Sequence, residues 1–479
     1  MQLSSLSLAI TNILGAGRFD PASWFAAGEQ GAWYDPSDFT TLFQDSAGTI
    51  PVTAVEQPVG LMLDKSQSLA LGNEIIVNGN FATDTWWTKS AASITIAGGV
   101  GVATSAANGE GWYRTGVLTT NTFYEITFTV VSCSSGGFYV WQAGAQTVRS
   151  TPGTYTVRVL ATQAQVGILC SGVTTGTIDN ISYKQVTGNH AFQATAGNRP
   201  TLSARVNILL ATGTLSTQTV TTLATTYTLS FTGTGTITLT GTATGVYTAG
   251  TYSITCTAGS LVVTVAGLAT TADLRPANIG TTLPSYQRIA AATDYDTAGF
   301  PLYLKTNGIS SAMQTNSIDF TATDKMTIVT GVRRLGSDRS KIILEFTPLV
   351  SNTGGVAIYE NDLTTGDYNF QMQNGYRYSA LSAPSSNVLS VNYDRSQIST
   401  NLQISPRING AVPTLTSSGS PVAASNFVSN SLYLFARNNG ASLWFNGQFY
   451  GAIICGASKT TAEIQQAESY ENQKAGGLY

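Results

Sequence analysis

The sequence predicts an all-β chain of several tandem β-sandwiches, and three observations support this class. The chain has 479 residues, too many for one ordinary core, since a domain usually takes about 100 to 200 residues. Charged residues make up 10% of the chain, against roughly 25% in soluble domains, while threonine, serine and glycine are abundant. Short segments with alternating apolar and polar residues recur along most of the chain, and this period of two is typical of strands.

Composition also excludes several classes of partner and site. The 23 lysines and arginines nearly balance the 26 acidic residues and form no cluster, so we expect no nucleic-acid partner. Residues 1–14 are rich in leucine and isoleucine, but polar residues interrupt them and no basic stretch precedes them, so we expect neither a signal peptide nor membrane insertion. The cysteines lack metal-site spacing, and we expect buried free thiols, although Cys133 and Cys170 fall in one predicted domain and could pair.

Residues 1–72 are predicted to form an irregular N-terminal anchor segment. Its four prolines interrupt any regular element, and its aromatic rings outnumber what such a segment can cover alone. The rings therefore need a partner surface, which could be a later domain, a sister chain or another protein. The candidate anchor residues are Trp24, Phe25, Trp33, Tyr34, Phe39 and Phe43.

Residues 73–186 contain period-two strands divided by glycine and asparagine turns, which predicts a sandwich. Their first and last segments, 74–81 (EIIVNGNF) and 178–183 (IDNISY), resemble the terminal strands of jelly-roll carbohydrate-binding modules. The resemblance implies sugar rings stacked on aromatic side chains and a structural calcium near Glu74 and Asp179. Because neighbouring residues of a strand point to opposite faces, paired aromatics should place some rings outside the core. The candidate sugar-stacking residues are Trp86, Trp87, Trp112, Tyr113, Tyr139 and Trp141.

The rest of the chain is predicted to hold a connector and two further sandwiches. After a polar connector at 187–209, residues 210–267 form a small threonine- and glycine-rich sandwich of immunoglobulin-like size, with no site chemistry. Residues 268–479 have longer strands, an Asn446–Gly447 pair that predicts a hairpin, and one closing helix at about 460–474. Thr460 and Glu463 can form a capping box for this helix, and Gly476 ends it.

The last region resembles concanavalin-like, laminin-G-type lectin folds and, more narrowly, C-terminal domains of bacteriophage virion proteins. The resemblance rests on residues 432–447 (LYLFARNNGASLWFNG), on 449–451 (FYG) and on the closing helix that ends at 472–476 (NQKAG). Segments at 33–38 (WYDPSD) and 60–66 (GLMLDKS) resemble a stretch near the start of such phage proteins. The resemblance implies a virion surface protein, assembled in the bacterial cytoplasm and attached to other virion proteins through its N-terminal segment.

No catalytic constellation is apparent, and we expect no enzymatic activity and no required cofactor. The sole histidine, His190, stands in the connector without a serine or cysteine motif and is interpreted as a solvated linker residue. The acidic residues of the last region mostly follow strand ends or occupy turns, where solvated carboxylates are expected. They are Asp319, Asp324, Glu345, Glu360, Asp362 and Asp367.

The favoured hypothesis is a phage fiber or surface appendage that contacts a host cell-surface glycan. A decoration protein of the capsid or tail without sugar binding, a polysaccharide depolymerase and a bacterial extracellular carbohydrate-binding protein are the alternatives. Uncharged sandwich flanks and edge strands without lysine or glutamate tend to pair, so we also expect a homo-oligomer. A trimer is favoured only because related phage fibers are usually trimeric.

Overall fold

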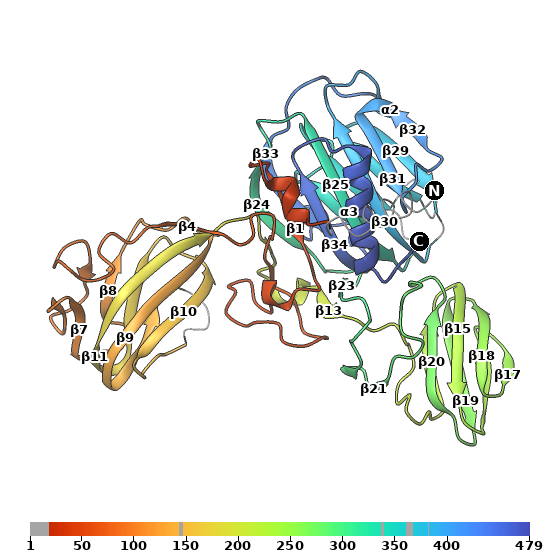
Figure 1. Ribbon diagram of the computed structural model, residues 1–479, viewed down its shortest axis with the longest axis horizontal. Coiled ribbons are helices and arrows are strands. Elements are labelled where there is room, and N and C mark those ends of the chain that lie inside the picture. The colour runs from red at the N-terminus through yellow and green to blue at the C-terminus, as the bar shows by residue number, and fades with distance from the viewer. Residues whose placement is uncertain (1–18, 143–146, 337–339, 361–366, 382) are drawn as a thin grey trace, which may run out of the picture.

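The computed structural model has three lobes: a central sandwich and two smaller ones on either side of it (Figure 1). It describes residues 19–142, 147–336, 340–360, 367–381 and 383–479. The predicted all-β class, with tandem sandwiches and one substantial C-terminal helix, is confirmed. No helix in these residues is long and apolar enough to cross a membrane.

The first layer of the central lobe is a seven-stranded antiparallel sheet. Its middle strands are long and almost fully buried, as expected for strands covered on both faces. β1 (Gly31–Tyr34) joins it by pairing with β34 (Gly447–Cys455), with Gly31 opposite Cys455. The remaining order is β13 (Thr201–Ser203), β23 (Tyr303–Lys305), β34, β25 (Lys325–Arg334), β30 (Ser385–Asp394) and β31 (Ile404–Ile408).

The second layer is a ten-stranded sheet that packs on the first through one large apolar core. Core residues come from both ends of the chain, including Tyr34, Leu42 and Met62 beside Leu434 and Ile454. The strand order is β2 (Leu42–Phe43), β3 (Leu61–Met62), β12 (Ala191–Phe192), β24 (Met313–Asp319), β33 (Ser429–Leu434), β26 (Ile342–Phe346), β27 (Val356–Glu360), β28 (Asp367–Met372), β29 (Gly375–Ala380) and β32 (Thr416–Gly419).

Helix α3 (Thr461–Lys474) covers the outer face of the seven-stranded sheet (Figure 1). The predicted capping box is present: the Thr460 hydroxyl accepts from the Glu463 N–H, and the Glu463 carboxylate accepts from the Thr460 N–H. The short helices are η1 (Pro21–Phe25), η2 (Phe39–Thr41), η3 (Ala196–Asn198) and α2 (Thr400–Gln403).

The second lobe is the jelly-roll lobe, built from β4 to β11 around its own core. Its longest strand, β11, links different parts of the lobe, because its first part pairs with β8 and its last part pairs with β4. The strands are β4 (Leu71–Glu74), β5 (Thr88–Lys89), β6 (Ile94–Ala97), β7 (Val100–Ala106), β8 (Gly111–Arg114), β9 (Phe123–Val140), β10 (Gly153–Leu160) and β11 (Val166–Val186).

The third lobe is a small sandwich of a four-stranded and a three-stranded sheet, in which threonine alternates with buried apolar residues. The four-stranded order is β14 (Gln218–Thr222), β19 (Gly259–Ala266), β16 (Thr236–Gly241) and β17 (Gly245–Tyr247). The three-stranded order is β18 (Gly250–Cys256), β15 (Thr225–Thr232) and β20 (Thr270–Pro276), and a ribbon of β21 (Ile289–Ala291) and β22 (Asp294–Tyr295) follows.

The lobes are nested, which differs from the domains in linear order that the sequence suggested. Residues 19–66 belong to the central sandwich instead of a separate anchor segment, since β1, β2 and β3 are strands of its two sheets. The expected connector at 187–209 holds the central strands β12 and β13. The jelly-roll lobe and the small sandwich are therefore two insertions into one central sandwich domain. Residues 1–18 of the predicted anchor lie outside the described residues.

The predicted hairpin at Asn446–Gly447 is wrong. β33, before this pair, lies in the ten-stranded sheet, whereas β34, after it, lies in the seven-stranded sheet. The glycine is needed for close packing, because a Cβ at Gly447 would lie 2.3 Å from the Arg333 carbonyl oxygen and from the Phe445 ring. All four cysteines are free thiols: Cys170, Cys256 and Cys455 are buried, and Cys133 is half-buried.

Candidate functional site: an aromatic platform on the jelly-roll lobe

Two of the six candidate sugar-stacking rings belong to the core of the jelly-roll lobe. Trp87 and Trp112 are 5% and 0% exposed and pack around Phe81. Their indole N–H groups donate to the Asn78 and Thr95 carbonyl oxygens at 2.7 and 3.0 Å. Both side chains are thus fully used inside the protein and offer no face to a sugar.

Tyr113 and Trp141 meet on the outer face of the same lobe. Tyr113 follows the buried Trp112 on β8 and therefore points outward. Tyr113 lies opposite Gly167 of β11, and the backbone N–H of Trp141 donates to the Gly167 carbonyl oxygen at 2.9 Å. The ring centroids of Tyr113 and Trp141 are 5.1 Å apart with an interplanar angle of 87°.

Gly167 makes this contact possible. A Cβ at position 167 would lie 3.0 Å from the Tyr113 Cβ and 3.3 Å from the Trp141 ring, so any side chain would push the rings apart. Strand β11 therefore passes beneath the two rings at Gly167 without separating them. No sequence motif marks Gly167, and only the pairing of three strands reveals its part in the site.

Tyr139 extends the same surface. It precedes Trp141 by two residues, so both side chains point to one face while Phe138 and Val140 point into the core. Partial burial raises the pKa of Tyr139, which keeps its hydroxyl protonated as a hydrogen-bond donor at neutral pH. Tyr113, Tyr139 and Trp141, all half-buried, form what we call the aromatic platform.

Trp86 lies apart from this arrangement. It packs edge-on against Trp87 at 4.6 Å, and the Arg114 guanidinium lies 5.1 Å from its ring centroid. Arg114 also donates to the Trp86 carbonyl oxygen at 2.7 Å. Since the cation covers one face of the indole, Trp86 is less open to stacking than the platform rings are.

The predicted anchor rings are covered by the chain itself. Five of them are buried, and Phe39 is half-buried against the central core. Trp33, for example, contacts Tyr470 of α3 at 6.1 Å between centroids, and Lys65 lies 4.5 Å from its ring. The partner surface of these rings is therefore a later part of the same chain.

The expected calcium ligands do not form a cation cage. The Glu74 carboxylate accepts hydrogen bonds from the Ile76 N–H, the Tyr183 N–H and the Ser182 hydroxyl, and Asp179 accepts one from the Asn180 N–H. No group of three His, Cys, Asp or Glu residues able to hold a metal ion is found in the described part of the chain. Both carboxylates thus accept hydrogen bonds from the protein itself.

His190 is buried, and its interpretation as a solvated linker residue is wrong. Its Nδ1 accepts from the Asp64 N–H at 3.0 Å, while Nε2 lies 3.2 Å from the Val186 carbonyl oxygen. Burial lowers the pKa of His190 to about 4, so the ring is neutral. Among the acids, the buried Glu345 pairs with Arg437 at 3.0 Å and also accepts from the Val350 N–H. Asp362 lies outside the described residues.

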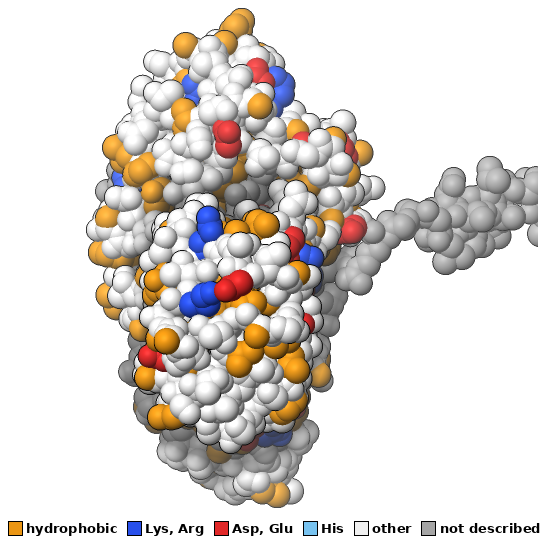
Figure 2. Space-filling view, turned by 90° about the vertical axis from the view of Figure 1, so that its left-hand side faces the viewer, with side chains coloured by type: hydrophobic (Ala, Val, Ile, Leu, Met, Phe, Trp, Pro, Cys, Tyr) orange, Lys and Arg blue, Asp and Glu red, His pale blue; other side chains and the backbone are white. Residues whose placement is uncertain are grey.

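Figure 2 views the molecule from the jelly-roll side. This face is mostly uncharged: apolar side chains gather in patches, and only a few acidic and basic groups stand among them. A ligand on this face would therefore be held mainly by stacking and neutral hydrogen bonds, because long-range charge attraction is weak here.

Comparisons with known proteins give fold-level similarities only. No family model matches the chain, and no curated protein matches it. A solved carbohydrate-binding module, the CBM40 of Ruminococcus gnavus IT-sialidase bound to α2,3-sialyllactose, is similar at 10% identity and a TM-score of 0.26. This similarity covers 35% of the present chain and 96% of the module.

Two sialidases are similar over a comparable share of the chain. The K499G mutant of the NanB sialidase from Streptococcus pneumoniae matches at 12% identity and a TM-score of 0.24, over 34% of this chain and 27% of the enzyme. The sialidase of Trypanosoma rangeli matches at 12% identity and a TM-score of 0.23, over 40% and 30%. The chain thus spans less than a third of each sialidase.

Proposed function

We propose that this chain is a non-enzymatic glycan-binding protein and that the aromatic platform is its sugar site. The observation that carries the proposal is the outward-facing Tyr113–Trp141 pair over Gly167. An indole gives a flat apolar plate for the C–H face of a sugar ring, and tyrosine hydroxyls can donate to or accept from sugar hydroxyls.

The platform rests on strands, which favours binding. Tyr113 and Tyr139 are held in register by β11, and the backbone of Trp141 is held by its N–H bond to the Gly167 carbonyl oxygen. Rigid side chains lose little conformational entropy when a ligand binds, so more of the contact energy appears as affinity.

The proposal is tested by applying the full-length protein to a glycan array and titrating the strongest ligand in a calorimeter. Trp141→Ala should weaken binding about tenfold or more, because truncating a central aromatic removes a main contact. Tyr252→Ala is the matched control, since Tyr252 belongs to another half-buried ring pair, 4.9 Å from Tyr247 on the small sandwich. An array without any binding, or equal loss in both variants, would contradict the proposal.

We further propose that the chain is displayed on a bacteriophage particle as a fiber or surface appendage. Supporting this, the resembling stretches near the two ends of the chain lie together in the central sandwich. There β1, which enters the segment 33–38, pairs with β34, which contains residues 449–451. Antibodies against the chain should label the outside of intact particles in electron micrographs. Labelled particles whose protein binds no glycan would indicate a decoration protein instead.

Two related expectations belong to the same proposal. We propose a homo-oligomer, with a trimer as the favoured form, so light scattering at micromolar concentration should give a multiple of 50.2 kDa. We also propose that the chain does not cleave glycans, and incubation with the bound polysaccharide should release no reducing ends.

A further inference from the structure

A cavity of about 340 Å³ lies where the jelly-roll lobe meets the loop after β2. Phe43 and Pro51 of the central domain form one wall, and Val140, Val157 and Val159 of β9 and β10 form the opposite one. Its size is that of a small-molecule site, and such sites often lie between domains. None of the platform rings lines this cavity, so it is a separate site.

The two walls are held together by direct contacts. The Leu160 N–H, at the end of β10, donates to the Ala47 carbonyl oxygen at 2.9 Å. Phe43 and Phe123 pack with their centroids 6.1 Å apart. Gly48 has φ +72°, and a Cβ there would lie 2.5 Å from the Phe123 ring, so the loop approaches the lobe as closely as a glycine allows. The cavity is therefore already formed in the free protein.

One positive charge in this cavity has no counter-charge among the described residues. Arg158 and Glu125 neutralise each other, with Arg158 Nε and Nη2 at 2.9 and 2.8 Å from Glu125 Oε2. Arg149 makes no ion pair in the described part of the chain, and its Nε is buried there without a hydrogen-bond partner. A positive charge held partly out of water without a counter-charge costs free energy, and a ligand carboxylate in the cavity would reduce that cost.

Tyr155 orients this guanidinium. The Arg149 guanidinium carbon lies 4.9 Å from the Tyr155 ring centroid, and the Tyr155 hydroxyl donates to the Thr151 carbonyl oxygen at 2.6 Å. The stacked ring covers one face of the guanidinium, which leaves its in-plane N–H groups for a ligand. A carboxylate can match that planar fork with two parallel hydrogen bonds, and the apolar lining favours an organic anion over an inorganic one.

We propose that this junction cavity binds a small organic carboxylate. Arg149 receives the carboxylate through its terminal N–H groups, and the apolar part of the ligand lies against Val140, Val157 and Phe43. Because the walls belong to two lobes, a bound ligand also holds the jelly-roll lobe against the central sandwich, and it stabilises the docked arrangement by mass action.

The test uses benzoate, with benzamide as its neutral isostere, on the full-length protein in ligand-observed NMR and calorimetry. Benzoate should bind saturably and benzamide at least about tenfold more weakly, since the charge-assisted hydrogen bonds are lost. Arg149→Gln should weaken benzoate binding by a similar factor. Arg288→Gln is the control, because it removes the same charge from an exposed ion pair with Asp294.

A second variant keeps the test decisive if Arg149→Gln fails to fold. Thr156 lines the cavity but is exposed, so Thr156→Trp should fold and fill the cavity mouth. It should abolish benzoate binding without lowering the melting temperature. Absence of benzoate binding to the wild-type chain, equal binding of benzamide, or benzoate binding that survives Thr156→Trp would overturn the proposal.

Discussion

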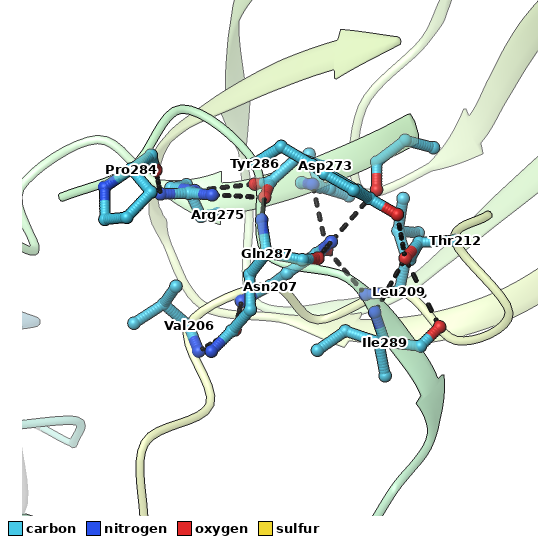
Figure 3. A network of polar contacts seen from close by, with 12 residues as sticks. Val206, Asn207, Leu209, Thr212, Asp273, Arg275, Pro284, Tyr286, Gln287 and Ile289 are labelled. Atoms are coloured by element: carbon cyan, nitrogen blue, oxygen red, sulfur yellow. Dashed lines mark hydrogen bonds and ion pairs between the residues drawn. The ribbon is translucent and has the colours of Figure 1, made fainter. Parts of the chain in front are cut away.

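The two inserted lobes join the central sandwich by junctions that differ in their share of polar contacts. The jelly-roll lobe is attached through an apolar cluster with residues from this lobe and from the central sandwich. Asp64 and His190 are two titratable groups beside the cluster. The small sandwich is attached through a buried network of amides, hydroxyls and one ion pair (Figure 3). The members of the apolar cluster are Phe43, Leu61, Leu63, Phe123, Leu160, Val186 and Phe192.

In the polar junction, the side chains of Asn207 and Gln287 make hydrogen bonds to backbone groups of the segments that enter and leave the small sandwich. The Asn207 side chain donates to the Ala272 and Gln287 carbonyl oxygens and accepts from the Leu209 and Leu274 N–H groups, all at 2.9–3.1 Å. Gln287 in turn accepts from two backbone N–H groups and donates to two carbonyl oxygens. Directional bonds thus orient the small sandwich next to an apolar cluster that includes Val206, Ile289 and Phe300, whereas the jelly-roll lobe depends mainly on packing.

The largest effect is expected at the apolar junction. Phe123→Ala should lower the free energy of unfolding by about 3–5 kcal/mol, because the ring is 1% exposed and its removal leaves a cavity between Phe43 and His190. Calorimetric melting and limited proteolysis of the junction would measure this loss. Val131→Ala is the control on the same strand, since Val131 is 47% exposed. Equal losses in both variants would contradict a packing-based junction.

A somewhat smaller loss is expected when the polar junction is broken. Asn207→Ala should cost about 2–4 kcal/mol, because two backbone N–H groups and two carbonyl oxygens lose their partner in a dry site. Hydrogen exchange at the Leu209 and Leu274 amides would report the local opening. Protection equal to that of the wild-type chain would show that these bonds are dispensable and would weaken the contrast between the junctions.

The smallest effect is a pH dependence of the jelly-roll junction. The pKa of His190 is about 4 in the folded state and about 6.5 in the unfolded state, so the unfolded state binds more protons between these values. Stability is fully present above pH 6.5 and falls as the pH decreases, by about 2 kcal/mol at pH 5.

Melting temperatures of wild type and His190→Gln between pH 7 and 5 would measure this term. Burial raises the pKa of the neighbouring Asp64, which acts in the opposite direction and remains in both proteins. The profile of the variant should therefore be flatter or reversed. Identical profiles would contradict a titrating His190 at this junction.

Local sequence signals predicted local features well. The capping box of α3 depends on residues three positions apart, and Thr460 and Glu463 form it as expected. Alternation also indicated that Trp112 and Tyr113 point to opposite faces, and the structure buries Trp112 and leaves Tyr113 at the surface. For Trp86 and Trp87 the strand assumption did not hold, because both precede β5 and Trp86 has φ +75°.

What the sequence by itself determined is the all-β class and its closing helix, because strand alternation and helix capping act over a few residues. The nesting of the lobes was decided only in the tertiary structure, where Gly31 pairs with Cys455 and aromatic rings near the start of the chain are buried under α3. Pairing across such distances depends on complementary surfaces that no local pattern records. The platform and the junction cavity arise in the same way, since each combines residues from separate strands or lobes.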